Sequence, residues 1–220
     1  MMDVGIPPRR TLATRDAMWA KRLAHALAQA GATPNGVSIA SVGWSLVACS
    51  ALGLAPAFTG AGAAAAFTVA AGAIQLRLLC NLLDGMLAVE EGLATPLGEL
   101  YNEIPDRVAD VVILAGAGAA VRDQAGGFEL GCAAAMTALL TAYVRVLGGS
   151  LGVTQSFAGP MAKQHRMFVL TLASIAAAGE SAFGLAPRAI LVSLIVIAAG
   201  SVLTAGRRIG SIAGELEARK

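Results

Sequence analysis

The sequence predicts an all-α integral membrane protein with six transmembrane helices and an N-terminal amphipathic helix at the membrane interface. Hydrophobic residues make up 56% of the 220 residues and the mean hydropathy is +0.70, whereas only 14% of the residues are charged. Soluble domains usually contain about a quarter charged residues. No Lys, Arg, Asp or Glu occurs between residues 26 and 76. That length holds two membrane spans of about twenty residues each.

The expected elements follow in order along the chain. Residues 1–13 are predicted to be a disordered cytoplasmic tail. Residues 14–31 are predicted to form a juxtamembrane helix with Trp19, Leu23 and Leu27 on one face, a pattern that a solvated linker helix would also show. The sequence TPN at 33–35 then breaks the chain. The rest of the chain is predicted to be a six-helix membrane domain, 32–210, followed by a cytoplasmic tail, 211–220. The first two spans lie on either side of the turn GLAPAFTGAG. The other four are the apolar segments 104–121, 128–147, 164–179 and 189–206.

The distribution of basic residues predicts the orientation in the membrane. An even number of spans places both termini on one side, together with fourteen of the 16 Lys and Arg residues, while Arg122 and Arg188 fall on the other side. The positive-inside rule therefore predicts that the termini and the charged stretch at 81–110 face the cytoplasm. The expected location is a bacterial inner membrane. The net positive charge indicates this topology and contact with anionic lipid, and it does not indicate nucleic-acid binding. The three cysteines form no C-x-x-C pair and predict neither a disulfide framework nor a thiolate metal site.

Runs of small residues occur within the predicted spans, for example GAGAAAA at 60–66 and AGAGAA at 115–120. Small residues allow helices to approach closely in lipid, where packing holds helices together. We expect nearly all of these glycines to serve packing, although a substrate cleft would also use them.

Polar residues gather between 81 and 110, after the second predicted span. Asn81 and Asp84 lie three residues apart on a helix, and Gly85 and Ala88 continue nearly the same face. Carboxylate and amide oxygens are ligands that suit Mg²⁺ bound together with substrate phosphates. Carboxylates within a membrane are costly and are therefore functional by default.

A second helix carries the other half of this polar stretch. We expect Thr95 and Pro96 to open it. Small and polar residues then recur every four positions, at Gly98, Asn102, Asp106 and Asp110. Two helices meeting here would bring Asn81, Asp84, Asn102 and Asp106 together as metal ligands. The alternative is a salt-bridged interface in which Asp84 or Asp106 pairs with Arg77 or Arg107.

These residues resemble the signature of the CDP-alcohol phosphatidyltransferase family, D-x2-D-G-x2-A-R-x8-G-x3-D-x3-D. Every spacing is kept, and five of the eight positions are identical. The matching positions are Asn81, Asp84, Gly85, Ala88, Val89, Gly98, Asn102 and Asp106. The juxtamembrane helix, the TPN break, the six spans and a basic segment after the fourth span also resemble the family's layout over most of the chain.

The resemblance implies that a CDP-linked lipid, CDP-diacylglycerol, gives its phosphatidyl group to an acceptor hydroxyl and releases CMP. It implies metal ligation by the motif's acidic positions, with Asp84 as a ligand and Asp106 as the base that deprotonates the acceptor. It also implies nucleotide contacts at Gly85, Ala88 and Gly98, and a homodimer. The acceptor alcohol is not specified by the sequence.

Three motif positions depart from the family pattern. Asn81 and Asn102 replace Asp, and Val89 replaces Arg. An amide oxygen can ligate a cation but carries no charge, so one Mg²⁺ or Mn²⁺ ion is expected in place of two. The same substitutions support an alternative function, a catalytically silent family member that binds nucleotide-lipid or assembles with membrane partners.

Further charged residues extend the candidate site. The basic residues predicted to bind the acceptor or a phosphate are Lys163, Arg166, Arg145 and His165. Positive-inside topology alone would also explain them. Asp110, one turn beyond Asp106, is either a carboxylate that supports the base or the partner of Arg107 or of a cation on another helix.

Overall fold

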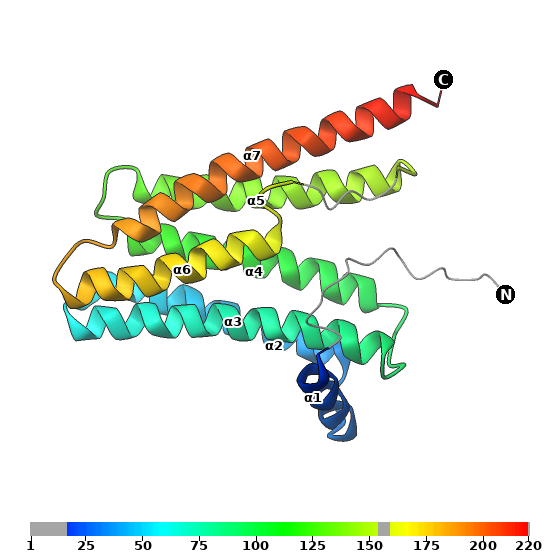
Figure 1. Ribbon diagram of the computed structural model, residues 1–220, viewed down its shortest axis with the longest axis horizontal. Helices are drawn as coiled ribbons and strands as arrows, with labels where there is room; N and C mark the ends of the chain where they lie inside the picture. The colour runs from blue at the N-terminus through cyan, green and yellow to red at the C-terminus, as the bar shows by residue number, and fades with distance from the viewer. Residues whose placement is uncertain (1–16, 154–158, 220) are drawn as a thin grey trace.

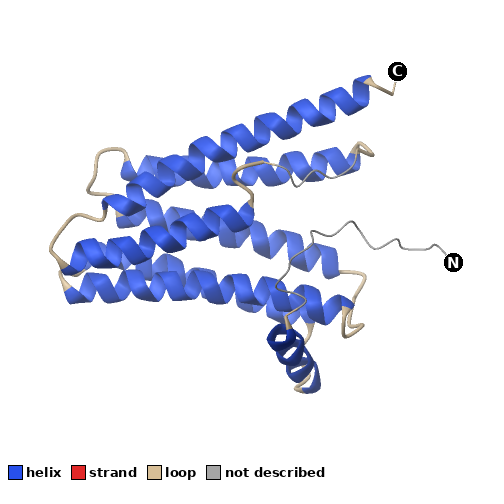
Figure 2. Ribbon diagram, viewed as in Figure 1, coloured by secondary structure: helices blue, strands red, loops and turns tan. Residues whose placement is uncertain are grey.

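The computed structural model describes residues 17–153 and 159–219, and all regular structure within them is helical (Figure 2). The helices are α1 (Met18–Gln29), α2 (Pro34–Leu54), the short 3-10 helix η2 (Ala55–Ala57), α3 (Ala61–Val89), α4 (Gly98–Ala120), α5 (Gly127–Ser150), α6 (Lys163–Ala182) and α7 (Arg188–Glu217). The predicted tail, 1–13, and the first residues of the predicted juxtamembrane helix lie outside the described residues.

Helices α2 to α7 run alongside one another as a bundle, and α1 lies across one end of it (Figure 1). Helices α3, α5 and α7 all end on the side where α1 lies, and the α4–α5 and α6–α7 turns lie at the opposite end (Figure 1). This arrangement matches the alternating topology expected from the apolar segments.

Four of the helical segments are long and apolar enough to cross a membrane, namely Pro34–Ala57, Ala61–Val89, Gly127–Ser150 and Arg188–Glu217. Length and composition within the described residues therefore support four of the six expected spans. Helices α4 and α6 lie beside the spans, but they carry charged residues that lower their hydropathy. Some of these charges, on Asp106, Asp110 and Arg166, are buried in the bundle and belong to the site described below.

Helix α1 is amphipathic, as predicted, and it also packs against α3, which the sequence did not indicate. Ala20 and Ala24 are buried against Leu82, Leu83 and Met86 of α3. The bulky residues at its start, Met18 and Trp19, are exposed, and Trp19 keeps 52% of its surface accessible. An imidazole nitrogen of His25 also lies 3.2 Å from a carboxylate oxygen of Glu91, which ties α1 to the connection between α3 and α4.

The predicted break at TPN is confirmed at the start of α2. The Thr33 hydroxyl accepts a hydrogen bond from the backbone N–H of Gly36 at 3.1 Å, and Pro34 occupies the first turn of the helix. Threonine at the cap followed by proline is a common helix start, because proline needs no hydrogen-bond partner there.

Glycines allow α4 to approach its neighbours closely. A Cβ added at Gly131 of α5 would lie 2.5 Å from the Cα of Gly118, and one added at Gly116 would lie 2.7 Å from the Cα of Cys49 on α2. Real side chains do not tolerate such distances, so these positions accept only glycine. The packing function expected of the small residues is therefore confirmed at these three positions.

Helix α7 continues beyond the apolar segment from which it was predicted. Residues 211–217, expected as part of a tail, form its last turns. No proline interrupts them, and Arg219 donates hydrogen bonds to the carbonyl oxygens of Leu151 and Gly152 after α5. The end of α7 is thus tied to the end of α5.

Candidate active site

Three helices bring charged side chains together inside the bundle. On α3, Arg77, Asn81 and Asp84 follow one another at intervals of four and three residues and so share one face. The other contributors are Asp106 and Asp110 of α4 and Lys163 and Arg166 of α6. Helical spacing within each segment therefore determines which residues meet.

Asp106 is buried and its two carboxylate oxygens have different partners. The Asn81 amide donates to Oδ1 at 2.6 Å, and the Lys163 ammonium donates to Oδ2. The Arg77 guanidinium lies 3.5 Å from Oδ1 and donates to the backbone oxygen of Asp106 at 3.3 Å. Asp106 therefore does form the ion pair with Arg77 that the sequence left as an alternative. Lys163 lies closer to Asp106 than Arg77 does.

Asp110 lies deeper and bridges two arginines. Its Oδ1 accepts from Arg77 at 2.7 Å and its Oδ2 from Arg166 at 2.8 Å. Arg166 also donates to the Thr141 hydroxyl and to the backbone oxygen of Met161. Of the two interpretations of Asp110, pairing with cations of other helices is the one observed, and Arg107 instead pairs with Glu103.

Asp84 differs from the other two aspartates because no Lys, Arg or His of the described residues forms an ion pair with it. It is 5% exposed, and the Ser38 hydroxyl donates to its Oδ2 at 2.7 Å. A buried carboxylate without a counter-charge is costly. On the neighbouring turn, Oδ1 of Asn81 is buried and has no hydrogen-bond partner among residues 17–153 and 159–219.

These two features fit one divalent cation. The Asp84 carboxylate and the Asn81 amide oxygen are hard oxygen ligands, and a substrate diphosphate would supply others. Asp106 has no free carboxylate oxygen to offer a further cation, because Asn81 and Lys163 engage both of its oxygens. In the described parts of the chain, no group of three or more His, Cys, Asp or Glu side chains gathers to hold a metal.

The remaining motif residues surround this cluster less closely. Asn102 is exposed, and its side chain forms no hydrogen bond with the described residues. Gly85 and Ala88 lie on α3 just beyond Asp84, and Gly98 is the first residue of α4. Thr95 and Pro96 do not open α4 as predicted, because the helix begins at Gly98 with no side-chain cap.

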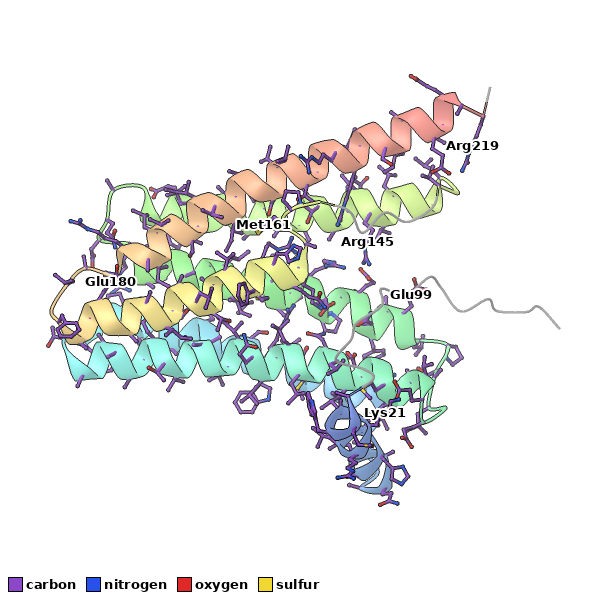
Figure 3. The ribbon with its side chains drawn as sticks, in the orientation of Figure 1. Lys21, Glu99, Arg145, Met161, Glu180 and Arg219 are labelled. Atoms are coloured by element: carbon purple, nitrogen blue, oxygen red, sulfur yellow. The ribbon has the colours of Figure 1, made fainter. Side chains whose placement is uncertain are left out.

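The four basic residues predicted for the acceptor are all engaged within the protein. Lys163 pairs with Asp106 and Arg166 with Asp110. Arg145 of α5 pairs with Glu103 of α4, at the end of the bundle away from Glu180 (Figure 3). His165 is exposed and donates from Nδ1 to the backbone oxygen of Pro160 at 3.0 Å. Only Lys163 and Arg166 join the central cluster, and the acceptor role of all four stays a prediction.

The comparisons with known proteins bear on the fold. No protein-family model matches the sequence, and no curated protein sequence matches it. Among solved structures, phosphatidylinositol phosphate synthase of Mycobacterium tuberculosis with CDP-DAG bound superimposes with a TM-score of 0.74, covering 89% of this chain and 94% of that chain at 21% identity. The chain has the fold of that synthase.

Two further structures of the same synthase agree. The complex with manganese and citrate gives a TM-score of 0.72 at 20% identity, covering 88% of each chain. The apo form gives 0.69 at 21% identity, covering 87% of this chain and 94% of that chain. The fold expected from the family resemblance is therefore confirmed.

Sequence reasoning treated Arg77 as a possible ion-pair partner but did not place it at the centre of the site. A single arginine within a long apolar helix needs an internal partner, and its spacing from Asn81 and Asp84 was visible in the sequence. Ser38 and Thr141 carried no such signal. Arg77, Arg166 and Arg208 are also buried within helices, so they do not contribute to the charge asymmetry between loops.

Proposed function

We propose that this protein is a CDP-alcohol phosphatidyltransferase, which transfers the phosphatidyl group of CDP-diacylglycerol to an acceptor hydroxyl and releases CMP. The observation that carries the proposal is the buried Asp84 carboxylate, which forms no ion pair within the described residues. Asn81, three residues earlier on α3, has a buried Oδ1 that finds no hydrogen-bond partner there either. This pair lies beside Asp106 at the motif spacing, in a fold shared with a synthase whose structure contains CDP-DAG.

The proposed residues would divide the reaction between them. Asp84 and the Asn81 oxygen would hold one Mg²⁺ or Mn²⁺ ion, which neutralises charge on the diphosphate. The acceptor oxygen forms a bond to the phosphorus that bears diacylglycerol, and the bond from that phosphorus to the oxygen of CMP breaks. Asp106 takes the acceptor's proton. Gly85, Ala88 and Gly98 would contact the nucleotide, since small residues let a ligand approach the helix backbone.

The surroundings of the site suit a lipid substrate. An apolar groove of about 710 Å³ lies between α4 and α5, with Glu103 and Arg107 among its lining residues. These two residues lie within one helical turn of Asp106, so the groove runs along the helix that carries the proposed base. We propose that the protein lies in a bacterial inner membrane with this site on the cytoplasmic side. We also propose a homodimer, which mass measurement in a mild detergent would distinguish from a monomer.

The decisive assay combines purified protein, CDP-diacylglycerol, Mg²⁺ and a panel of alcohols, with CMP and the lipid products measured by mass spectrometry. We expect one alcohol to give a new phospholipid in equal amount to CMP, and Asp84→Asn to abolish both. In sealed vesicles of known orientation, product should form only when the alcohol is on the cytoplasmic face. CMP and lipid levels that match a sample without protein would contradict transferase activity.

One observation favours the second candidate function, a silent relative that binds nucleotide-lipid. Both carboxylate oxygens of Asp106 are engaged, and Asn102 stands apart from the cluster. The same assay separates the two functions, because a silent protein would bind CDP-diacylglycerol and release no CMP.

A further inference from the structure

We infer that the ammonium group of Lys163 is the counter-cation of Asp106, in the position where a second divalent ion would otherwise be needed. The inference rests on the proposed function, because it concerns the same site. It assigns to Lys163 a role other than the phosphate binding predicted from its place in a basic segment.

The pairing of charges in the cluster supports this role. Its three carboxylates, Asp84, Asp106 and Asp110, face three protein cations, Arg77, Arg166 and Lys163. Asp110 contacts both arginines, and Asp106 contacts Lys163 directly. Asp84 forms no ion pair within the described residues, although the charge of Lys163 also acts on it. The cluster is neutral as a whole, but its cations contact Asp106 and Asp110. A divalent ion would therefore bind at Asp84 and not at Asp106.

Asn81 and Lys163 act on Asp106 in complementary ways. An aspartate at position 81 would place a second carboxylate within about 3 Å of Asp106, and two such groups need a shared cation or a proton. The amide removes this repulsion because its NH₂ group donates to Oδ1 of Asp106 at 2.6 Å. Lys163 then neutralises the other oxygen. The loss of acidic ligands and the presence of this lysine are thus parts of one charge balance.

The position of Lys163 suits a counter-cation that leaves room for a substrate. It is the first residue of α6, and its side chain is 24% exposed, whereas Arg77 and Arg166 are almost fully buried. A divalent ion brought to Asp106 would meet the ammonium at contact distance and be repelled. The site therefore takes one divalent ion as long as Lys163 keeps its charge.

The test counts Mn²⁺ ions bound to the purified full-length protein in the presence of CDP, by electron paramagnetic resonance. The native protein is expected to bind one ion. Asn81→Asp with Asn102→Asp should tighten that ion but still bind one. The triple variant that also carries Lys163→Gln should bind a second ion. Its affinity for that ion should be roughly tenfold or more above that of the double variant, which keeps Lys163. Lys163→Arg in place of Gln should keep the count at one.

Arg107→Gln is the matched control, because it removes a nearby positive charge that pairs with Glu103 and not with Asp106. It should leave the count unchanged. Two ions bound with Lys163 present, or no gain from Lys163→Gln, would overturn the inference, as would a failure of every variant to bind Mn²⁺. CMP release is measured separately, so a protein that shows these counts without releasing CMP keeps the role of Lys163 and loses only the transferase proposal.

Discussion

Asp106→Asn is expected to lower turnover of CDP-diacylglycerol about 10²- to 10⁴-fold, the range that a positioned base contributes. The amide keeps the size of the side chain and can still accept from Lys163, but it cannot take the acceptor's proton. CDP binding should remain measurable, because Asp84 and Asn81 are unchanged. The measurement is the initial rate of CMP release at saturating substrate, together with CDP affinity.

Asp123→Asn is the control for this variant. It makes the same chemical change on an exposed residue of the α4–α5 turn, at the opposite end of the bundle, and turnover should be unaffected. Turnover at the native level in Asp106→Asn, with expression and folding intact, would exclude Asp106 as the base.

Asp110→Asn is expected to reduce the free energy of unfolding by about 3–5 kcal/mol, the cost of leaving buried partner charges uncompensated. Asp110 is the shared partner of Arg77 and Arg166, and all three side chains are buried. The amide would leave Arg166 without its carboxylate partner and Arg77 with only the longer contact to Asp106, at 3.5 Å. Reversible unfolding in mixed detergent micelles measures the change.

A matched variant is available at the surface. Glu215→Gln removes the carboxylate of an exposed pair with Arg219, four residues away on the chain, and should cost at most about 1 kcal/mol. If Asp110→Asn were no more destabilising than Glu215→Gln, the buried network would not hold α3, α4 and α6 together as described.

Local sequence patterns predicted much of the fold. The TPN break, the amphipathic α1 and the turn before α3 depend on residues close together in the chain, and each is present. The motif spacing also indicated that Asn81 and Asp84 share a face of α3, and both lie near Asp106, whereas Asn102, expected to join them, is exposed. Of the six expected spans, α4 and α6 are not supported by length and composition, because both helices carry charged residues.

The pairing of charges could not be predicted in the same way. Lys163 and Asp106 are 57 residues apart, and Arg166 and Asp110 are 56 apart. Their contact depends on how α4 and α6 are rotated about their axes, which sequence spacing within one helix does not specify. Ser38 meets Asp84 for the same reason, through the packing of α2 on α3. The candidate ligands were therefore visible in the sequence, and their counter-charges were not.

The central claim is that Asp84 and Asn81 form the divalent cation site that orients a CDP-lipid beside Asp106. It is tested most directly by an anomalous difference map from crystals of the protein with Mn²⁺ and CDP-diacylglycerol. We predict one Mn²⁺ peak in contact with Asp84 Oδ1 or Oδ2, with Asn81 Oδ1 and with the diphosphate, while Lys163 remains on Asp106. A diphosphate bound elsewhere in the bundle, with no metal density at Asp84, would contradict the account.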